Sequence, residues 1–313
     1  MTFRNRRIGV IGNGGQARRI KSALRLEGFH PDCIFKPSLK EGDDGVTDDF
    51  DEILACNIIF LCSPNATHFH YLYMLLGERY IFCEKPPVQT EEHLNALKEL
   101  DDGKVHYNFN LRYSELSRFL SKSQELEFGE LISANIILSH GLATKVDYPT
   151  SWRADPIICP KGVLEIVSIH AIDLVGYHFD IKSIVCNELS NRSGVGAGVD
   201  TANTAIALKN GARIDVFSTY FGPYFFQWTF VFENGLLNCD TNGITLRGPR
   251  DVFDQRGYFK LPPVLDHKAV DFNLDHAKSI DVSVGLFLKT AMREEKFDSR
   301  SRKLSFFSNS LMF

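Results

Sequence analysis

The sequence predicts an α/β protein: an N-terminal doubly wound parallel sheet, then a second α/β domain with an open, mostly antiparallel sheet. Apolar strand-like runs alternate with amphipathic helical stretches over the first third of the chain, and a glycine-rich turn follows the first run. Beyond residue 181, strand-like segments are joined by hairpin turns. The 313 residues suffice for two domains, which we place at 1–114 and 115–313.

The strands and helices of the first domain follow from local patterns. Apolar residues recur every three or four positions over residues 16–27, which predicts a helix after a strand at 8–11. The run at 58–62 is apolar throughout, as is typical of a parallel strand covered on both faces. By the same reasoning, further strands are expected at 33–35, 80–83 and 105–109, and further helices at 50–55, 68–76 and from Thr90 onward.

The second domain has longer strands and one apolar helix. We expect a strand at 131–139, a helix at 162–179 and a final helix at about 275–293. Two Asn-Gly pairs, at 210–211 and 234–235, predict tight hairpin turns with positive φ. Four alternating aromatic residues lie on one strand face, which we expect a second copy of the chain to cover: Phe226, Trp228, Phe230 and Phe232.

Composition excludes several classes of protein. The 35 Lys and Arg residues against 39 Asp and Glu residues give a net charge of −4, so no nucleic-acid partner is expected. The sequence has neither a long apolar run nor a signal-peptide pattern, so we expect a cytoplasmic protein without a membrane partner. The seven cysteines show neither C-x-x-C nor zinc-type spacing, so we expect no disulfide framework and no metal.

A G-x-G-x-x-A motif lies between the first predicted strand and helix. In this context the first glycine allows the sharp turn, the second lets the backbone approach a pyrophosphate, and the alanine allows close helix packing. The helix N-terminus then offers N–H groups to the phosphates. We therefore expect a dinucleotide-binding Rossmann domain, whose contacts are Gly12, Asn13, Gly14, Gly15, Gln16 and Ala17. The alternative is an ordinary glycine-rich turn.

The end of the second predicted strand indicates which dinucleotide is bound. NAD-binding chains place an acidic residue there to bind the ribose 2′-hydroxyl. This chain has Lys36 and Ser38 instead, with Arg18 or Arg19 as further candidates. The sequence therefore favours NADP over NAD, unless Lys36 is simply a solvated surface charge.

Two more motifs follow apolar strands and so lie at the carboxyl edge of the sheet, where open α/β sheets bind ligands. One is Glu84-Lys85-Pro86. A lysine beside a nicotinamide can hydrogen-bond a substrate oxygen, although a single lysine at a strand end is more often a surface charge. The other motif runs from Cys62 to His68, and its candidates for cofactor contact, like the glutamate and lysine, are Cys62, Ser63, Pro64, Asn65 and His68.

In order and spacing these motifs resemble the glucose-fructose oxidoreductase / inositol dehydrogenase / rhizopine catabolism (Gfo/Idh/MocA) family. That family carries G-x-G-x-x-A, P-N-x-x-H, E-K-P and a later D-x-x-x-H-x-x-D, and the resemblance covers almost the whole chain. It implies an NAD(P)-dependent oxidoreductase that transfers a hydride between nicotinamide and a secondary alcohol or ketone of a sugar or sugar derivative. It also implies a homodimer or homotetramer formed through the C-terminal sheet.

The resemblance also implies roles for individual residues. Lys85 and His170 would be catalytic, Glu84 would lie near the nicotinamide ribose, and Asn65 and His68 would line the cofactor path. The Lys85–Pro86 bond is often cis in such proteins. Substrate contacts would come from Lys85, Asn110, Arg112, Arg153, His170 and Asp173.

One position departs from the family pattern. Ile166 stands four residues before His170, where the family has an aspartate. The neighbouring Glu165 points about 100° away on an ideal α-helix. Either Glu165 replaces the missing acid through a shift of the helix, or the protein is a catalytically inactive NAD(P)-binding regulator. A different two-domain reductase is a further alternative.

Overall fold

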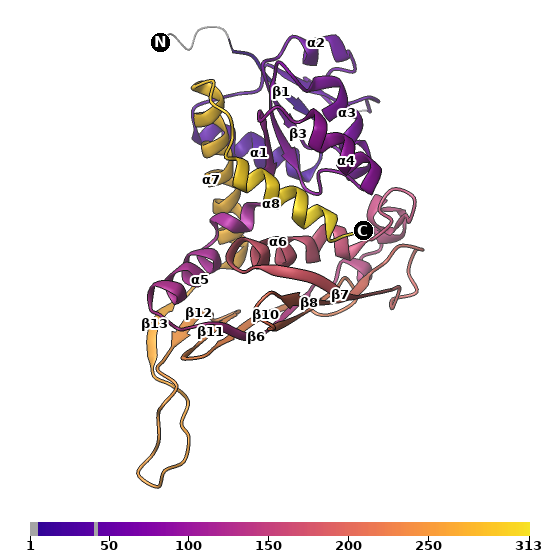
Figure 1. Ribbon diagram of the computed structural model, residues 1–313. Helices are drawn as coiled ribbons and strands as arrows, with labels where there is room; N and C mark the ends of the chain where they lie inside the picture. The colour runs from indigo at the N-terminus through magenta and orange to yellow at the C-terminus, as the bar shows by residue number, and fades with distance from the viewer. Residues whose placement is uncertain (1–5, 41–42) are drawn as a thin grey trace. The chain divides into compact units, whose positions relative to one another are not determined.

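The computed structural model describes residues 6–40 and 43–313 and divides into two compact units (Figure 1). The first unit comprises Met1–Asn110 with Ala277–Leu311 and Phe313, and the second comprises Leu111–His276 with Met312. The sequence analysis placed everything after residue 114 in the second domain. The structure instead groups the C-terminal helices with the N-terminal sheet.

The first unit contains a five-stranded parallel sheet with the order β2-β1-β3-β4-β5. β2 is added on one side of β1 and the later strands on the other, so the strand order reverses between β1 and β3, which is the switch point where such sheets bind ligands. The predicted doubly wound sheet is therefore confirmed. Its strands are β1 (Ile8–Ile11), β2 (Cys33–Phe35), β3 (Ile58–Leu61), β4 (Tyr80–Glu84) and β5 (Val105–Asn108). Its connecting helices are α1 (Gly15–Leu26), α2 (Phe50–Leu54), α3 (His68–Leu75) and α4 (Glu91–Leu100).

The two C-terminal helices are α7 (Phe272–Met292) and α8 (Ser299–Ser310). The ring of Phe287 on α7 lies 5.0 Å from that of Phe60 on β3 and 5.4 Å from that of Phe82 on β4. Ile280 and Val284 lie on the same apolar stripe and are buried in the same core. Periodicity predicted this helix and its apolar face, but it carries no information about which sheet that face packs on.

The second unit contains an eight-stranded sheet with the order β13-β12-β11-β10-β6-β9-β8-β7. Its neighbouring strands are antiparallel except for the pair β6 and β9, which confirms the open, mostly antiparallel sheet. The strands are β6 (Leu131–Ser139), β7 (Ile181–Ser190), β8 (Thr201–Leu208), β9 (Arg213–Thr219), β10 (Phe225–Phe232), β11 (Gly235–Asp240), β12 (Gly243–Arg247) and β13 (Val264–Lys268).

Both Asn-Gly hairpins form, but their turns differ from the prediction. Of these four residues, Gly211 alone has a positive φ, of 92°. A Cβ on Gly235 would lie 2.1 Å from the Phe128 ring. At the second hairpin the glycine therefore permits close packing instead of a left-handed backbone.

The aromatic face of β10 is covered within its own unit. Helices α5 (Glu115–Glu125) and α6 (Ile169–His178) lie over one face of the sheet (Figure 1). Trp228 is 4% exposed and Phe230 is fully buried, with the ring of Phe179 6.1 Å from that of Phe230. The expectation that a second copy covers this face is therefore wrong. Period-2 alternation identifies an apolar face, and here helices of the same chain bury it.

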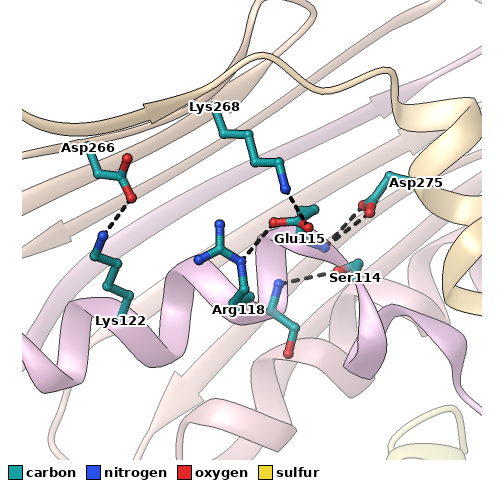
Figure 2. Close-up of polar contacts among 8 residues, drawn as sticks. Ser114, Glu115, Arg118, Lys122, Asp266, Lys268 and Asp275 are labelled. Atoms are coloured by element: carbon teal, nitrogen blue, oxygen red, sulfur yellow. Dashed lines mark hydrogen bonds and ion pairs between the residues drawn. The ribbon is translucent and has the colours of Figure 1, made fainter. Parts of the chain in front are cut away.

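Polar contacts fix α5 against the edge of this sheet (Figure 2). The Glu115 carboxylate accepts a hydrogen bond from Lys268 Nζ at 2.6 Å, and its backbone N–H donates to the Asp275 carboxylate at 3.2 Å. Further along the helix, Lys122 Nζ lies 2.6 Å from Asp266 Oδ2. Among the described residues, no helix is both long enough and apolar enough to cross a bilayer.

Candidate functional site

The glycine turn has the geometry that a dinucleotide requires. Gly12 has φ +103°, and a Cβ there would lie 2.8 Å from the Cys62 carbonyl oxygen, so the sharp turn needs glycine. A Cβ on Gly14 would meet no heavy atom within 4 Å, which leaves open space beside the backbone. Gly14 is the N-cap of α1, and no acidic side chain occupies the first turn. The free N–H groups of this helix end therefore suit an anionic diphosphate.

Glu84, at the end of β4, is tied to the start of α1. Its Oε1 accepts hydrogen bonds from Gln16 Nε2 at 2.7 Å and from Asn108 Nδ2 at 2.8 Å. Ser283 Oγ in turn donates to Asn108 Oδ1 at 2.8 Å. Burial raises the pKa of the Glu84 carboxyl, and the two amide hydrogen bonds oppose that rise. The network fixes the residue that precedes Lys85.

His68 connects the loops that follow β3 and β4. Its Nδ1 lies 2.8 Å from the Pro86 carbonyl oxygen and its Nε2 lies 2.9 Å from that of Ser63. Burial lowers the pKa of His68, and a neutral imidazole donates through one nitrogen only. The ring is fully buried, so in this structure it holds the Ser63 loop against the Lys85–Pro86 turn, whose peptide bond is cis as the resemblance implied.

The Ser63 loop and the Lys85–Pro86 turn differ in the exposure of their side chains. Pro64 is exposed and Ser63 is half-buried, whereas Asn65 is 6% exposed. Asn65 Nδ2 is buried with no hydrogen-bond partner among the described residues. Lys85 is half-buried at the carboxyl edge of the sheet.

Lys36 is paired with a carboxylate that the sequence analysis missed. Lys36 Nζ lies 2.7 Å from Asp43 Oδ2, while Asp43 Oδ1 accepts from Asn13 Nδ2 at 3.3 Å. Lys36 is therefore not a solvated surface charge, and Ser38 beyond it is exposed. No spacing rule singles out Asp43, because it lies in a polar loop seven residues after Lys36.

In the second unit, the helix expected at 162–179 begins with a π-helical segment, Leu164–Ser168, and continues as α6. The Ile169 N–H donates to the Leu164 carbonyl, five residues earlier. This i→i+5 hydrogen bond widens the turn, so the side-chain directions of an ideal α-helix do not apply between Glu165 and His170. The expected direction of Glu165 was that of an ideal α-helix and does not carry over to this segment, so the role of Glu165 stays a prediction. Glu165 is 2% exposed, whereas Ile166 is half-buried.

A polar cluster surrounds Glu165. The rings of Tyr148 and Tyr220 lie 6.1 Å apart, and each hydroxyl is buried with no hydrogen-bond partner among the described residues. Burial raises the pKa of Tyr148 to about 12. It also raises the pKa of Tyr220, to which the charges of Cys159 and Glu165 add. Arg153 stacks over the Trp152 ring at 4.4 Å. Hydrogen-bonding groups and a cation thus lie close to Glu165.

The remaining predicted substrate residues have protein partners. Arg112 and Asp173 form a buried ion pair in the second unit. Asn110 donates to Ser279 Oγ at 2.7 Å in the first unit. His170 is half-buried, and its ring lies 6.2 Å from that of His276, which the sequence analysis also missed. Across the described part of the chain, no three His, Cys, Asp or Glu side chains lie close enough together to hold a metal ion.

The chain shares its fold with solved oxidoreductases. Levoglucosan dehydrogenase in complex with NADH has a TM-score of 0.81 and 17% identity, with 98% of this chain and 96% of that chain covered. An NAD-binding oxidoreductase from Klebsiella pneumoniae has a TM-score of 0.78 and 13% identity, covering 98% and 95%. An oxidoreductase from Agrobacterium radiobacter, in complex with NAD+, L-tartaric acid and magnesium, has a TM-score of 0.77 and 15% identity, covering 98% and 94%. No family model and no curated protein sequence matches the chain.

Proposed function

We propose that the protein is an NAD(P)-dependent oxidoreductase that transfers a hydride between nicotinamide and a secondary alcohol or ketone of a sugar or sugar derivative. The observation that carries this proposal is the carboxyl edge of the parallel sheet. There the Gly12–Gly14 turn, open to a diphosphate, lies beside the end of β3, and Glu84 at the end of β4 joins the helix of that turn to the segment bearing Lys85.

The fit to a dinucleotide rests on the space around the glycines. A side chain at Gly12 would collide with the Cys62 backbone, whereas the space beside Gly14 is open. Gly14, Gly15 and Gln16 would hold the diphosphate through their N–H groups, with Asn13 at the adenosine end. Ser63, Pro64 and Asn65 would border the cofactor. When bound, the nicotinamide supplies the hydride chemistry, and the protein supplies orientation and a path for the proton.

The catalytic roles are those that the family resemblance implies. Lys85 would hydrogen-bond the reacting oxygen of the substrate and exchange a proton with it. His170 would act as the acid or base, because imidazole gains and loses a proton near neutral pH. Glu165, in the π-helical segment that precedes His170, would orient His170 and stabilise its protonated form. Arg153 and the hydroxyls of Tyr148 and Tyr220 are suited to the oxygen atoms of a polyol.

The solved structures with the same fold support a sugar-derived substrate. Levoglucosan dehydrogenase is known in complex with NADH and levoglucosan and with NADH and L-sorbose. We further propose a small-molecule partner in the cytoplasm and, as the family resemblance implies, a homodimer or homotetramer formed through the C-terminal sheet. The interface cannot be the buried face of β10, so we assign it to the opposite face, where Phe225 and Val231 are exposed.

The alternative, an inactive regulator that only senses the cofactor, depends on the loss of an acid at Ile166. Against it stands Glu165, the acid beside Ile166, which lies in a π-helical segment and not in the ideal α-helix on which that loss was argued. Two measurements separate the alternatives: fluorescence titration with NADH and NADPH, and turnover with a panel of keto-sugars, polyols and sugar nucleotides. The proposal predicts nucleotide binding and turnover with at least one member of the panel. Binding without any turnover supports the regulator, and no binding contradicts both.

A further inference from the structure

The loop after β2 brings a carboxylate back to the end of that strand. Asp43 Oδ2 accepts hydrogen bonds from Lys36 Nζ at 2.7 Å and from the Lys40 backbone N–H at 2.8 Å. Asp43 Oδ1 accepts from Asn13 Nδ2 at 3.3 Å, and Asn13 is held from its other side by Lys21 Nζ at 3.0 Å. These contacts hold the carboxylate in one place although it lies in a surface loop.

The Asp43 carboxylate contacts two segments of the first unit. Lys36 directly follows β2, and Asn13 is the middle residue of the glycine turn. The two segments are themselves joined, because the Gly12 N–H donates to the Phe35 carbonyl at 2.8 Å. In a Rossmann domain, the adenosine ribose lies between the glycine turn and the end of the second strand.

We propose that Asp43 is the residue that selects between the two dinucleotides, and that it favours NAD(H). This assignment rests on the proposed function and concerns the ribose end of the same site. It reverses the expectation drawn from Lys36 and Ser38 alone.

The preference follows from the chemistry of the two ligands. Ionised carboxylates accept several hydrogen bonds, and among the described residues Asp43 Oδ1 accepts one from Asn13, at the long distance of 3.3 Å. Oδ1 therefore has capacity for a ribose hydroxyl. A 2′-phosphate would bring about two further negative charges to the same carboxylate. Lys36 offsets little of that repulsion, because its ammonium is already hydrogen-bonded to Asp43.

The hydrogen bond from Lys36 is also the largest cause of the lowered pKa of Asp43, so the carboxylate is ionised at neutral pH. Removing this charge frees Lys36 for a 2′-phosphate. The Asp43→Asn variant keeps the size of the side chain and an oxygen acceptor but loses the charge. Asp44→Asn is the matched control, because it removes the same charge from an exposed neighbour.

The test is the ratio of the NADPH and NADH dissociation constants, measured by nucleotide fluorescence for the wild type, Asp43→Asn and Asp44→Asn. We expect the wild type to bind NADH more tightly. Asp43→Asn should shift the ratio towards NADPH by at least about tenfold, the effect expected of one charge-assisted hydrogen bond. Asp44→Asn should change both constants together and leave the ratio within about twofold of the wild-type value.

An unchanged ratio in Asp43→Asn, or a wild type that prefers NADPH, would overturn the role of Asp43 while leaving the oxidoreductase proposal intact. A protein that binds neither nucleotide would overturn the proposed function, and this assignment with it. A ratio that moves equally in both variants would show that general electrostatics, not contact with Asp43, sets the preference.

Discussion

Arg112 and Asp173 form a two-point ion pair in the interior of the second unit. Arg112 Nε lies 2.8 Å from Asp173 Oδ2, and the second contact, from the terminal nitrogen to Oδ1, is 2.6 Å. Their side chains are 2% and 1% exposed. The charge of Asp173 offsets the effect of burial and raises the pKa of Arg112. The motif that suggested substrate contacts at these residues therefore also marks a structural pair.

Removing one partner of this pair should destabilise the fold strongly. Asp173→Ala leaves the guanidinium buried without its counter-charge, so we expect a loss of about 3–5 kcal/mol in the free energy of unfolding, measured with urea. The control is Asp215→Ala, which breaks the exposed pair Arg213–Asp215, whose N–O distance is 2.8 Å, and should cost under about 1 kcal/mol. Equal losses in the two variants would contradict the role of burial.

The raised pKa of Glu84 predicts a pH-dependent difference between the wild type and Glu84→Gln. The folded state holds the Glu84 proton more tightly than the unfolded state, so this group stabilises the fold at acidic pH. That contribution is lost as the pH rises through the raised pKa. Glutamine stays neutral throughout, so the melting temperature of the variant minus that of the wild type should increase from acidic to neutral pH. A difference that does not change with pH would count against a raised pKa.

Substitution of Trp228 tests which face of β10 is buried within its own unit. Because its side chain is buried within the unit, Trp228→Ala should lower the free energy of unfolding by about 3–5 kcal/mol. Gln227 is adjacent, exposed and on the opposite face, and Gln227→Ala should change stability by about 0.5 kcal/mol or less. A Trp228→Ala protein of unchanged stability that merely dissociates on light scattering would restore the view that this face is an interface between copies.

Residue patterns predicted individual strands and helices, but not how distant elements pack together. The apolar run at 58–62 and the cap at Thr90 each produced the expected element, because strand and helix periodicity act over a few residues. The packing of α7 on the parallel sheet and the cover over Trp228 depend on which distant elements meet. Period and spacing carry no signal for those choices.

In the candidate site, too, some residues were predicted from the sequence and others were missed. The glycine turn and the Lys85 turn were placed by motif and context, and Gly12 has the backbone that the motif requires. Asp43 was missed because it reaches Lys36 through a loop, and no spacing rule fixes the length of that loop. The π-helical turn was missed because residue counting assumed an α-helix at Glu165.

Glu165 and Ile166 can be compared directly in activity. If Glu165 lies one turn before His170 and positions it, Glu165→Gln should lower kcat by about 10²-fold and shift the pH dependence of kcat. A folded and soluble variant is a precondition, and circular dichroism checks it. Ile166→Leu is the matched control and should stay close to wild type. A Glu165→Gln enzyme with the wild-type rate and pH profile would show that the carboxylate has no part in the reaction.

We propose that hydride transfer takes place at the carboxyl edge of the sheet in the first unit, with Lys85 bound to the substrate oxygen. The most direct measurement compares wild type and Lys85→Ala in two assays on the same preparations: NADH affinity by fluorescence, and turnover by the absorbance of reduced nicotinamide. We expect Lys85→Ala to have an NADH dissociation constant within about threefold of wild type and a kcat lower by about 10²–10⁴-fold. Turnover at the wild-type rate in Lys85→Ala would contradict this proposal.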